Sequence, residues 1–150
     1  MNVLGIDPGT YNSAYVIWDG ASVLEHGYLA NDVLKQRLTD NGYDKLAIED
    51  ILLYGINGNE VRDTIKWMGR FDHERTATWL DNVTIRVHLC ANPKANQSAI
   101  RSALIDRFGG KGKAIGSKGA PGPLKEITAH KWSALAVAVT AYDQIEREGK

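Results

Sequence analysis

The stretch VLGIDPGT, residues 3–10, decides the fold, because an apolar run typical of a buried strand delivers one carboxylate, Asp7, directly into a Pro-Gly turn. An unpaired carboxylate loses its hydration at the end of a buried strand, so it usually has a partner such as a cation. Gly9 lets the turn reverse without side-chain crowding. Two interpretations follow: Asp7 is a metal ligand, or it caps a β-turn, since Asp before Pro-Gly is a common turn sequence.

The elements that follow predict a layered α/β domain. Asp19-Gly20 is a hairpin signal between two strands, and a third strand completes an antiparallel meander. Helical spacing and β-branched runs then alternate along the chain. The predicted strands are 3–7, 12–19, 22–29, 45–50 and 83–89, and the predicted helices are 31–39, one beginning near 59, 96–108 and 128–148. This order is similar to the ribonuclease H-like fold: a mixed five-stranded sheet flanked by helices.

Size and composition fit one domain over residues 1–150. No apolar run is long enough to suggest a membrane span, and no basic-then-apolar leader suggests export. The single Cys90 cannot form an internal disulfide. These features lead us to expect a cytoplasmic protein.

The net charge of zero hides an uneven distribution. Between Lys94 and Lys131 there are eight Lys or Arg and two acids, so the rest of the chain carries a matching negative excess. Such a basic stretch suggests a polyanionic partner, although a solvated helix face plus a lysine-rich loop would give the same pattern. Residues 109–123 contain six Gly, three Lys and two Pro, which predicts a flexible basic loop.

A second carboxylate is expected beside Asp7. If the first and fourth strands are neighbours, their carboxyl ends meet, and alternation within LAIE, residues 46–49, sends Glu49 to the face opposite Leu46 and Ile48. Asp50 would then face the other way or cap the following turn. A strand that ended one residue earlier would reverse this choice.

The last helix offers a third group at its start. His130 and Ser133 share one helical side with apolar residues that would pack on the sheet, so the polar end of this stripe can point toward the carboxylates. His130 is suited to bind a divalent metal or to assist proton transfer. A histidine at a helix start can equally be an exposed or a hydrogen-bonded structural residue.

Three segments together resemble the signature segments of the RuvC family of Holliday junction resolvases. They are GIDPGT at 5–10, LAIE at 46–49 and HKWSALAV at 130–137, and the region from 89 to 123 looks most like compact phage or prophage members. The first segment alone is shared with other ribonuclease H-like proteins.

The resemblance implies a homodimeric, Mg²⁺-dependent endonuclease that makes paired symmetrical nicks in a four-way DNA junction, with Mn²⁺ able to replace Mg²⁺. Asp7, Glu49 and His130 would be the catalytic residues and the ligands of two metal ions. Nothing in the sequence points to a membrane or identifies a helicase partner.

Position 133 departs from the family pattern. Typical members carry an acid there, on the same helical face as the residue at position 130, whereas this chain has Ser133. A hydroxyl can orient a metal-bound water but binds a cation more weakly, so we expect lower metal affinity. Asp143 lies too far along the helix to replace the missing acid.

DNA contacts and a dimer interface are also predicted. Lysines that precede His130 in the sequence would neutralise junction phosphates. Family members tend to carry an aromatic residue three positions after the glutamate, where this chain has Leu52, so a nearby tyrosine would stack at the junction centre instead. The predicted DNA-binding residues are Lys111, Lys113, Lys118, Lys125, Lys131 and Tyr54, and the predicted interface residues are Val61, Ile65 and Met68, with Trp67 and Phe71 as additions. The alternative for the helix is that its apolar stripe packs on the sheet.

Rival functions remain at this stage. An actin-like ATPase shares the first motif but needs two such domains. An RNA-processing nuclease of the same fold would fit the same segments. Ser133 raises the alternative of a catalytically impaired junction-binding protein, whereas the retention of Asp7, Glu49 and His130 in register points to a site in which His130 suffices.

Overall fold

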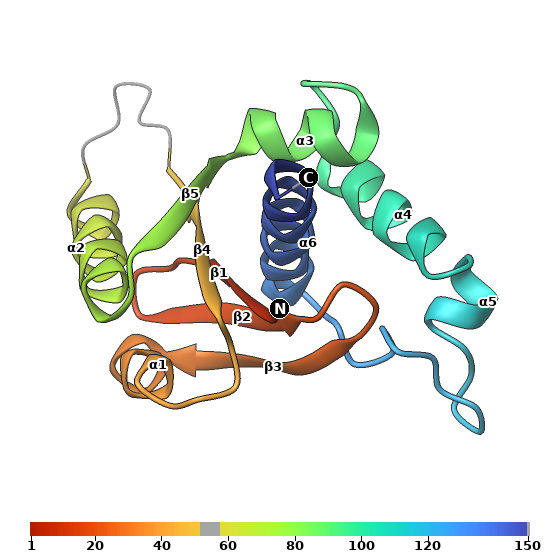
Figure 1. Cartoon of the computed structure of the whole chain (residues 1–150), viewed down its shortest axis with the longest axis horizontal. Coiled ribbons are helices and arrows are strands. Elements are labelled where there is room, and N and C mark those ends of the chain that lie inside the picture. The colour runs from red at the N-terminus through yellow and green to blue at the C-terminus, as the bar shows by residue number, and fades with distance from the viewer. Residues whose placement is uncertain (52–57, 150) are drawn as a thin grey trace.

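The computed structural model describes residues 1–51 and 58–149, and Figure 1 shows their arrangement. Five strands and six helices are found in this part of the chain. The strands are β1 (Val3–Asp7), β2 (Asn12–Trp18), β3 (Val23–Ala30), β4 (Lys45–Asp50) and β5 (Ala77–Asp81). The helices are α1 (Asn31–Leu38), α2 (Asn59–Glu74), α3 (Asn82–Cys90), α4 (Gln97–Arg107), α5 (Lys111–Ala114) and α6 (His130–Glu148).

The strands form one mixed sheet in the order β3-β2-β1-β4-β5, which confirms the predicted five-stranded sheet. β1, β2 and β3 are the antiparallel meander, whereas β4 pairs in parallel with β1 on one side and with β5 on the other. Gly5 is opposite Ala47, and Ile6 is opposite Ile48. The carboxyl ends of β1 and β4 therefore lie side by side, as the sequence predicted.

Helices cover both faces of the sheet. Ile6 and Ile48 point to a core shared with Leu34 of α1 and Phe71 of α2. The opposite face packs against α6, whose middle is almost entirely buried, and against α3 and α4. Figure 1 shows α1 and α2 together at one side and α6 crossing the sheet, with α4 and α5 extending away from it.

Gly5 sets how closely α6 approaches β1. A Cβ atom at this position would lie 2.6 Å from the backbone nitrogen of Ala138 and 2.7 Å from the carbonyl oxygen of Ala134. Only glycine accommodates so close a helix–strand contact. Because His130 precedes Ala134 by one helical turn, this contact brings the start of α6 to the end of β1.

The fifth strand is not where the sequence placed it. Residues 83–89 belong to α3, and the strand is the preceding Ala77–Asp81. Val83, Ile85 and Val87 alternate like a strand, but Ile85 is buried while Val83 and Val87 are 42% and 47% exposed, so the alternation does not mark a buried strand face. The Asp81 side chain accepts a hydrogen bond from the Thr84 backbone and starts the helix there.

The basic segment has more structure than a plain loop. Residues 109–123 contain α5 and a bridge between Gly116 and Pro121. Ala114 and Leu124 are fully buried and attach the segment to the core. Its flexibility stays a prediction. The last helix begins at His130, two residues later than expected.

The apolar stripe of α2 packs partly on the sheet. Met68 and Phe71 are 4% and 0% exposed and belong to the core, so neither is an interface residue. Ile65 is 40% exposed and Val61 is half-buried, and these two remain accessible on α2. In the described residues, none of the helices has the length and apolar character needed to cross a membrane.

Candidate active site

Asp7 stands at the end of β1 in front of a turn that a polar network holds rigid. The Gly9 backbone N–H donates to Ser13 Oγ at 3.0 Å, and this hydroxyl donates to Asn31 Oδ1 at 2.6 Å. The Asn31 amide in turn donates to the Gly9 carbonyl at 2.9 Å. Ser13 and Asn31 are 0% and 1% exposed, so the network is protected from water. A Cβ atom at Gly9 would lie 2.2 Å from the Asn12 carbonyl oxygen, which explains the glycine.

Glu49 lies beside Asp7 on the face of the sheet that α6 covers. Strand alternation places Glu49 with Ala47, which packs toward α6, and sends Asp50 to the opposite face with Ile48. The carboxyl groups of Asp7 and Glu49 are close enough for each to shift the pKa of the other. The arrangement is the one that alternation favoured, with Glu49 rather than Asp50 facing Asp7.

Burial makes the paired carboxylates costly to ionise. Desolvation raises the pKa of Asp7 from 3.8 to about 6, although its hydrogen bond with Glu49 opposes the shift. Desolvation also raises the pKa of Glu49 from 4.5 to about 8, and the negative charge of Asp7 adds to this effect. Strong pKa perturbation by burial and a charged neighbour is characteristic of functional sites.

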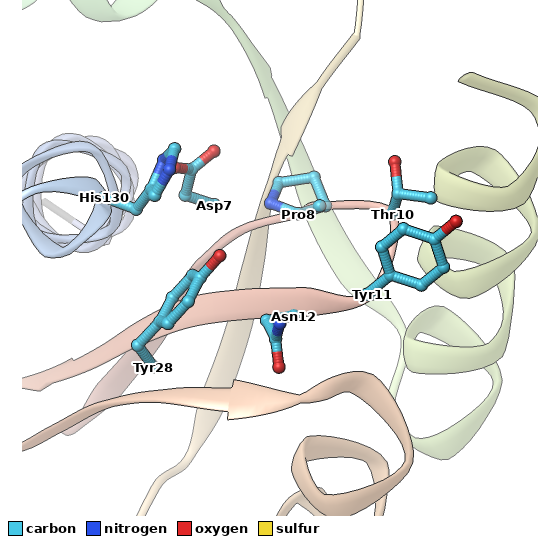
Figure 2. Close-up of a pocket in the computed structure, with 8 residues that line it drawn as sticks. Asp7, Pro8, Thr10, Tyr11, Asn12, Tyr28 and His130 are labelled. Atoms are coloured by element: carbon cyan, nitrogen blue, oxygen red, sulfur yellow. The ribbon is translucent and has the colours of Figure 1, made fainter. Parts of the chain in front are cut away.

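His130 comes to Asp7 from the first turn of α6. Its Nδ1 lies 3.2 Å from Asp7 Oδ2, and its side chain remains 65% exposed. The imidazole stacks on the Tyr28 ring with centroids 5.5 Å apart and planes 11° apart. Figure 2 shows Asp7 and His130 pointing toward one another, with Tyr28 alongside. Ala129, just before the helix, has the positive φ of 48°, which strains a residue with a Cβ.

Two hollows adjoin these side chains. One of about 270 Å³ is lined by the residues of the β1–β2 turn together with Asp7, Tyr28 and His130 (Figure 2). A wider groove of about 520 Å³ runs between the starts of α4 and α6 and is lined by His130, Ser133 and Arg101. The Arg101 guanidinium lies over the Trp132 ring, 4.9 Å from its centroid.

Ser133 faces the Glu49 side of the site. A small cavity there is lined by Glu49, Ser133, Asn82 and Gln97, together with apolar residues. The polar partners of Glu49 in this cavity are therefore amides and a hydroxyl, without a further carboxylate. The Asp143 side chain is engaged elsewhere, accepting hydrogen bonds from His88 and Arg107 at 2.7 and 2.8 Å.

The donor set fits a hard divalent cation. Two adjoining, largely desolvated carboxyl groups favour a cation, and carboxylate oxygens are the ligands that Mg²⁺ and Mn²⁺ prefer. Within residues 1–51 and 58–149, no three His, Cys, Asp or Glu side chains already converge at metal-binding distance. The fit therefore rests on Asp7 and Glu49, with His130 in contact with Asp7 alone.

The predicted DNA-binding lysines do not gather at the carboxylates. Lys131 is half-buried and lines a hollow with Tyr28 and His130. Lys111 and Lys113 are exposed on α5, at the outer end of the helical arm in Figure 1. Lys118 and Lys125 are exposed in the segment between α5 and α6. Tyr54 and Leu52 lie outside the described residues.

Sequence reasoning missed several side chains at this site. Tyr28 shares a row of the sheet with Asp7, because Asp7 is opposite Ala14 and Ala14 is opposite Tyr28. The predicted meander includes Tyr28, but only the register between its strands shows that Tyr28 lies in the same row as Asp7. Arg86 was hidden because residues 83–89 were assigned to a strand, and Asn82 because it directly precedes that segment.

The fold resembles that of two solved structures. Thermus thermophilus RuvC aligns with a TM-score of 0.68 and 16% identity, covering 99% of this chain and 97% of that chain. T. thermophilus RuvC in complex with Holliday junction substrate aligns with a TM-score of 0.68 and 19% identity, covering 97% and 96%. No protein-family model and no curated protein sequence matches. The likeness establishes a RuvC-like, ribonuclease H-like fold.

Proposed function

We propose that this protein is a structure-selective DNA endonuclease that resolves four-way junctions by paired, symmetrical, Mg²⁺-dependent nicks. The observation that carries the proposal is the pairing of the half-buried carboxyl groups of Asp7 and Glu49, with His130 Nδ1 at 3.2 Å from Asp7, on a RuvC-like fold. The solved T. thermophilus RuvC complex, which contains Holliday junction substrate, supports the choice of DNA.

Asp7 and Glu49 would hold the divalent cation, whose role is to activate water and to stabilise the departing oxygen of the cleaved phosphodiester. The carboxyl groups of Asp7 and Glu49 would lose their protons more easily beside the cation, because its positive charge would offset the cost of burying the carboxylates. The turn network behind Asp7 keeps that carboxylate in place before substrate arrives. We retain two ions per site as the expectation from the family resemblance.

His130 would act on protons at the edge of this site. Its Nδ1 side is occupied by Asp7, so the other nitrogen of the exposed ring is available to a substrate phosphate or to water. The stacked Tyr28 ring restricts how the imidazole can turn. His130 therefore combines a fixed orientation with access to solvent, which proton transfer requires.

Contacts to the DNA backbone would come from the basic segment. Lys111, Lys113, Lys118 and Lys125 are exposed, and Lys131 lies next to His130. Such contacts give affinity that falls with salt and carry little sequence information. Replacing Lys111 and Lys113 together should lower the salt dependence of junction binding without changing where the strands are cut.

Paired nicks call for two sites, so we propose a homodimer. A two-fold axis would present two copies of the Asp7 site to one junction. On α2, Ile65 and Val61 remain as candidate contacts. Light scattering at micromolar concentration should give the mass of a dimer, and a monomer together with asymmetric cutting would contradict this part of the proposal.

A non-catalytic junction-binding protein is the second candidate, favoured by the neutral Ser133 beside Glu49. An RNA-processing nuclease of the same fold is the third outcome that the experiment below distinguishes.

The test compares labelled four-way junction, duplex, flap and structured RNA in Mg²⁺, Mn²⁺ or EDTA. Wild type should nick the junction symmetrically in Mg²⁺ and in Mn²⁺, and it should not cut the junction in EDTA. Asp7→Asn should abolish cutting, whereas Asp50→Asn, the matched change on the opposite face of β4, should leave it. Junction binding without cleavage in either metal would support the second candidate. Preferential cutting of RNA would support the third.

A further inference from the structure

Arg86 is a half-buried cation that forms no ion pair within residues 1–51 and 58–149. Its Nε is buried and has no hydrogen-bond partner, and no described acid forms an ion pair with it. Arg37 and Arg107, by contrast, each pair with a carboxylate, at 2.7 and 2.8 Å. A buried donor without a partner costs free energy, so the Nε of Arg86 is available to an incoming hydrogen-bond acceptor.

The position of Arg86 connects it to the candidate active site. Glu49 is opposite Leu80 in the sheet, and β5 continues directly into α3. Asn82, in the first turn of α3, lines the small cavity with Glu49 and Ser133. Arg86 follows Asn82 by four residues and so lies on the same side of the helix. The positive charge of Arg86 and a hydrogen bond from Asn82 both lower the pKa of Glu49, against the larger effect of burial.

The Glu49 side of the site is poorly equipped for a second metal ion. The polar groups around the cavity are Asn82, Gln97 and Ser133, all uncharged. Even with both carboxyl groups ionised, Asp7, Glu49 and Arg86 together carry a single net negative charge, which one divalent ion already overcompensates. Before DNA binds, a second ion would meet the positive charges of the first ion and of Arg86, and Glu49 is the one carboxylate among the described residues that line this cavity.

We propose that Arg86 binds a phosphate oxygen of the DNA strand beside Glu49, in the place that a second divalent ion would take, so that the site works with one ion. The planar guanidinium suits a phosphate, to which it donates hydrogen bonds in a fork. This inference rests on the proposed nuclease function and amends its ion count.

The test separates metal binding from DNA chemistry. Mn²⁺ is titrated into metal-free protein by calorimetry and by electron paramagnetic resonance, for wild type, Arg86→Met, Arg86→Lys and the exposed control Arg147→Met. Wild type should bind one ion per chain. Arg86→Met should bind Mn²⁺ about tenfold more tightly because a repelling charge is gone. The Lys and control variants should stay within about twofold of wild type.

The same variants are then assayed on the four-way junction. Arg86→Met should cleave at least tenfold more slowly in saturating metal, and Arg86→Lys should recover part of the rate. A merely structural role would weaken metal binding and cleavage together, whereas opposite changes support the proposal. Two saturable ions in wild type, or unchanged cleavage by Arg86→Met, would overturn it. If wild type cleaves no substrate, the proposed function fails, while the ion count still decides for or against the single-ion site.

Discussion

Glu49→Gln should stabilise the metal-free protein, because the wild-type carboxyl group is buried beside Asp7. The folded protein holds the pKa of Glu49 near 8 against an ordinary value of 4.5. A carboxyl group with a raised pKa contributes fully to stability below its unfolded pKa and loses that contribution as pH rises toward the folded value. From 4.5 to pH 7 the loss extends over about 2.5 units at about 1.4 kcal/mol each, or roughly 3 kcal/mol.

Urea unfolding in EDTA measures this directly. Glutamine cannot ionise, so the variant should gain roughly 2–3 kcal/mol at pH 7 and almost nothing near pH 4.5. Asp50→Asn is the control, since that residue lies on the other face of the sheet. Excess Mg²⁺ should stabilise wild type and leave Glu49→Gln nearly unchanged. A variant that is less stable than wild type at pH 7, or that gains equally at both pH values, would refute the electrostatic explanation.

Three further predictions concern residues around His130. Tyr28→Ala should slow junction cleavage about three- to tenfold while Tyr28→Phe keeps the wild-type rate, because only the stacked ring is needed to orient His130; equal loss in both would contradict this. Ala129→Gly should raise the free energy of unfolding by about 1 kcal/mol in urea, since glycine tolerates the positive φ, and a loss of stability would argue against strain there. Ser133→Asp should bind Mg²⁺ more tightly by calorimetry, and equal or weaker binding would remove the affinity argument.

The central part of the site was predictable because it depends on simple periodicities. The alternation of LAIE distinguishes Glu49 from Asp50 as soon as β4 is placed next to β1. The helical spacing after His130 places His130 at the polar end of a helix face whose later residues are buried. Both arguments need only the direction of a side chain on its own element, which local sequence determines.

The missed features depend on partners that lie far away in the sequence. Tyr28 reaches His130 only through the register of three strands. Met68 was assigned to a surface because a helical stripe does not say whether a sheet or a second chain covers it. The position of Arg86 could be predicted only if residues 82–90 were known to form α3. The alternating β-branched residues around Arg86 instead predicted a strand.

The neutral Ser133 and the unpaired Arg86 form one electrostatic arrangement. An aspartate at position 133 would face the cavity beside Glu49, where it would attract a cation and also the guanidinium of Arg86. With serine there, Arg86 forms no ion pair with a described acid, and its Nε stays available to an incoming phosphate. If Arg86 binds phosphate as proposed, the serine keeps the site functional, since an acid at position 133 would have neutralised that cation. A polyanionic substrate favours an arginine over a second metal ion at this position, because an arginine attracts phosphate and, unlike a metal ion, needs no additional acidic ligands.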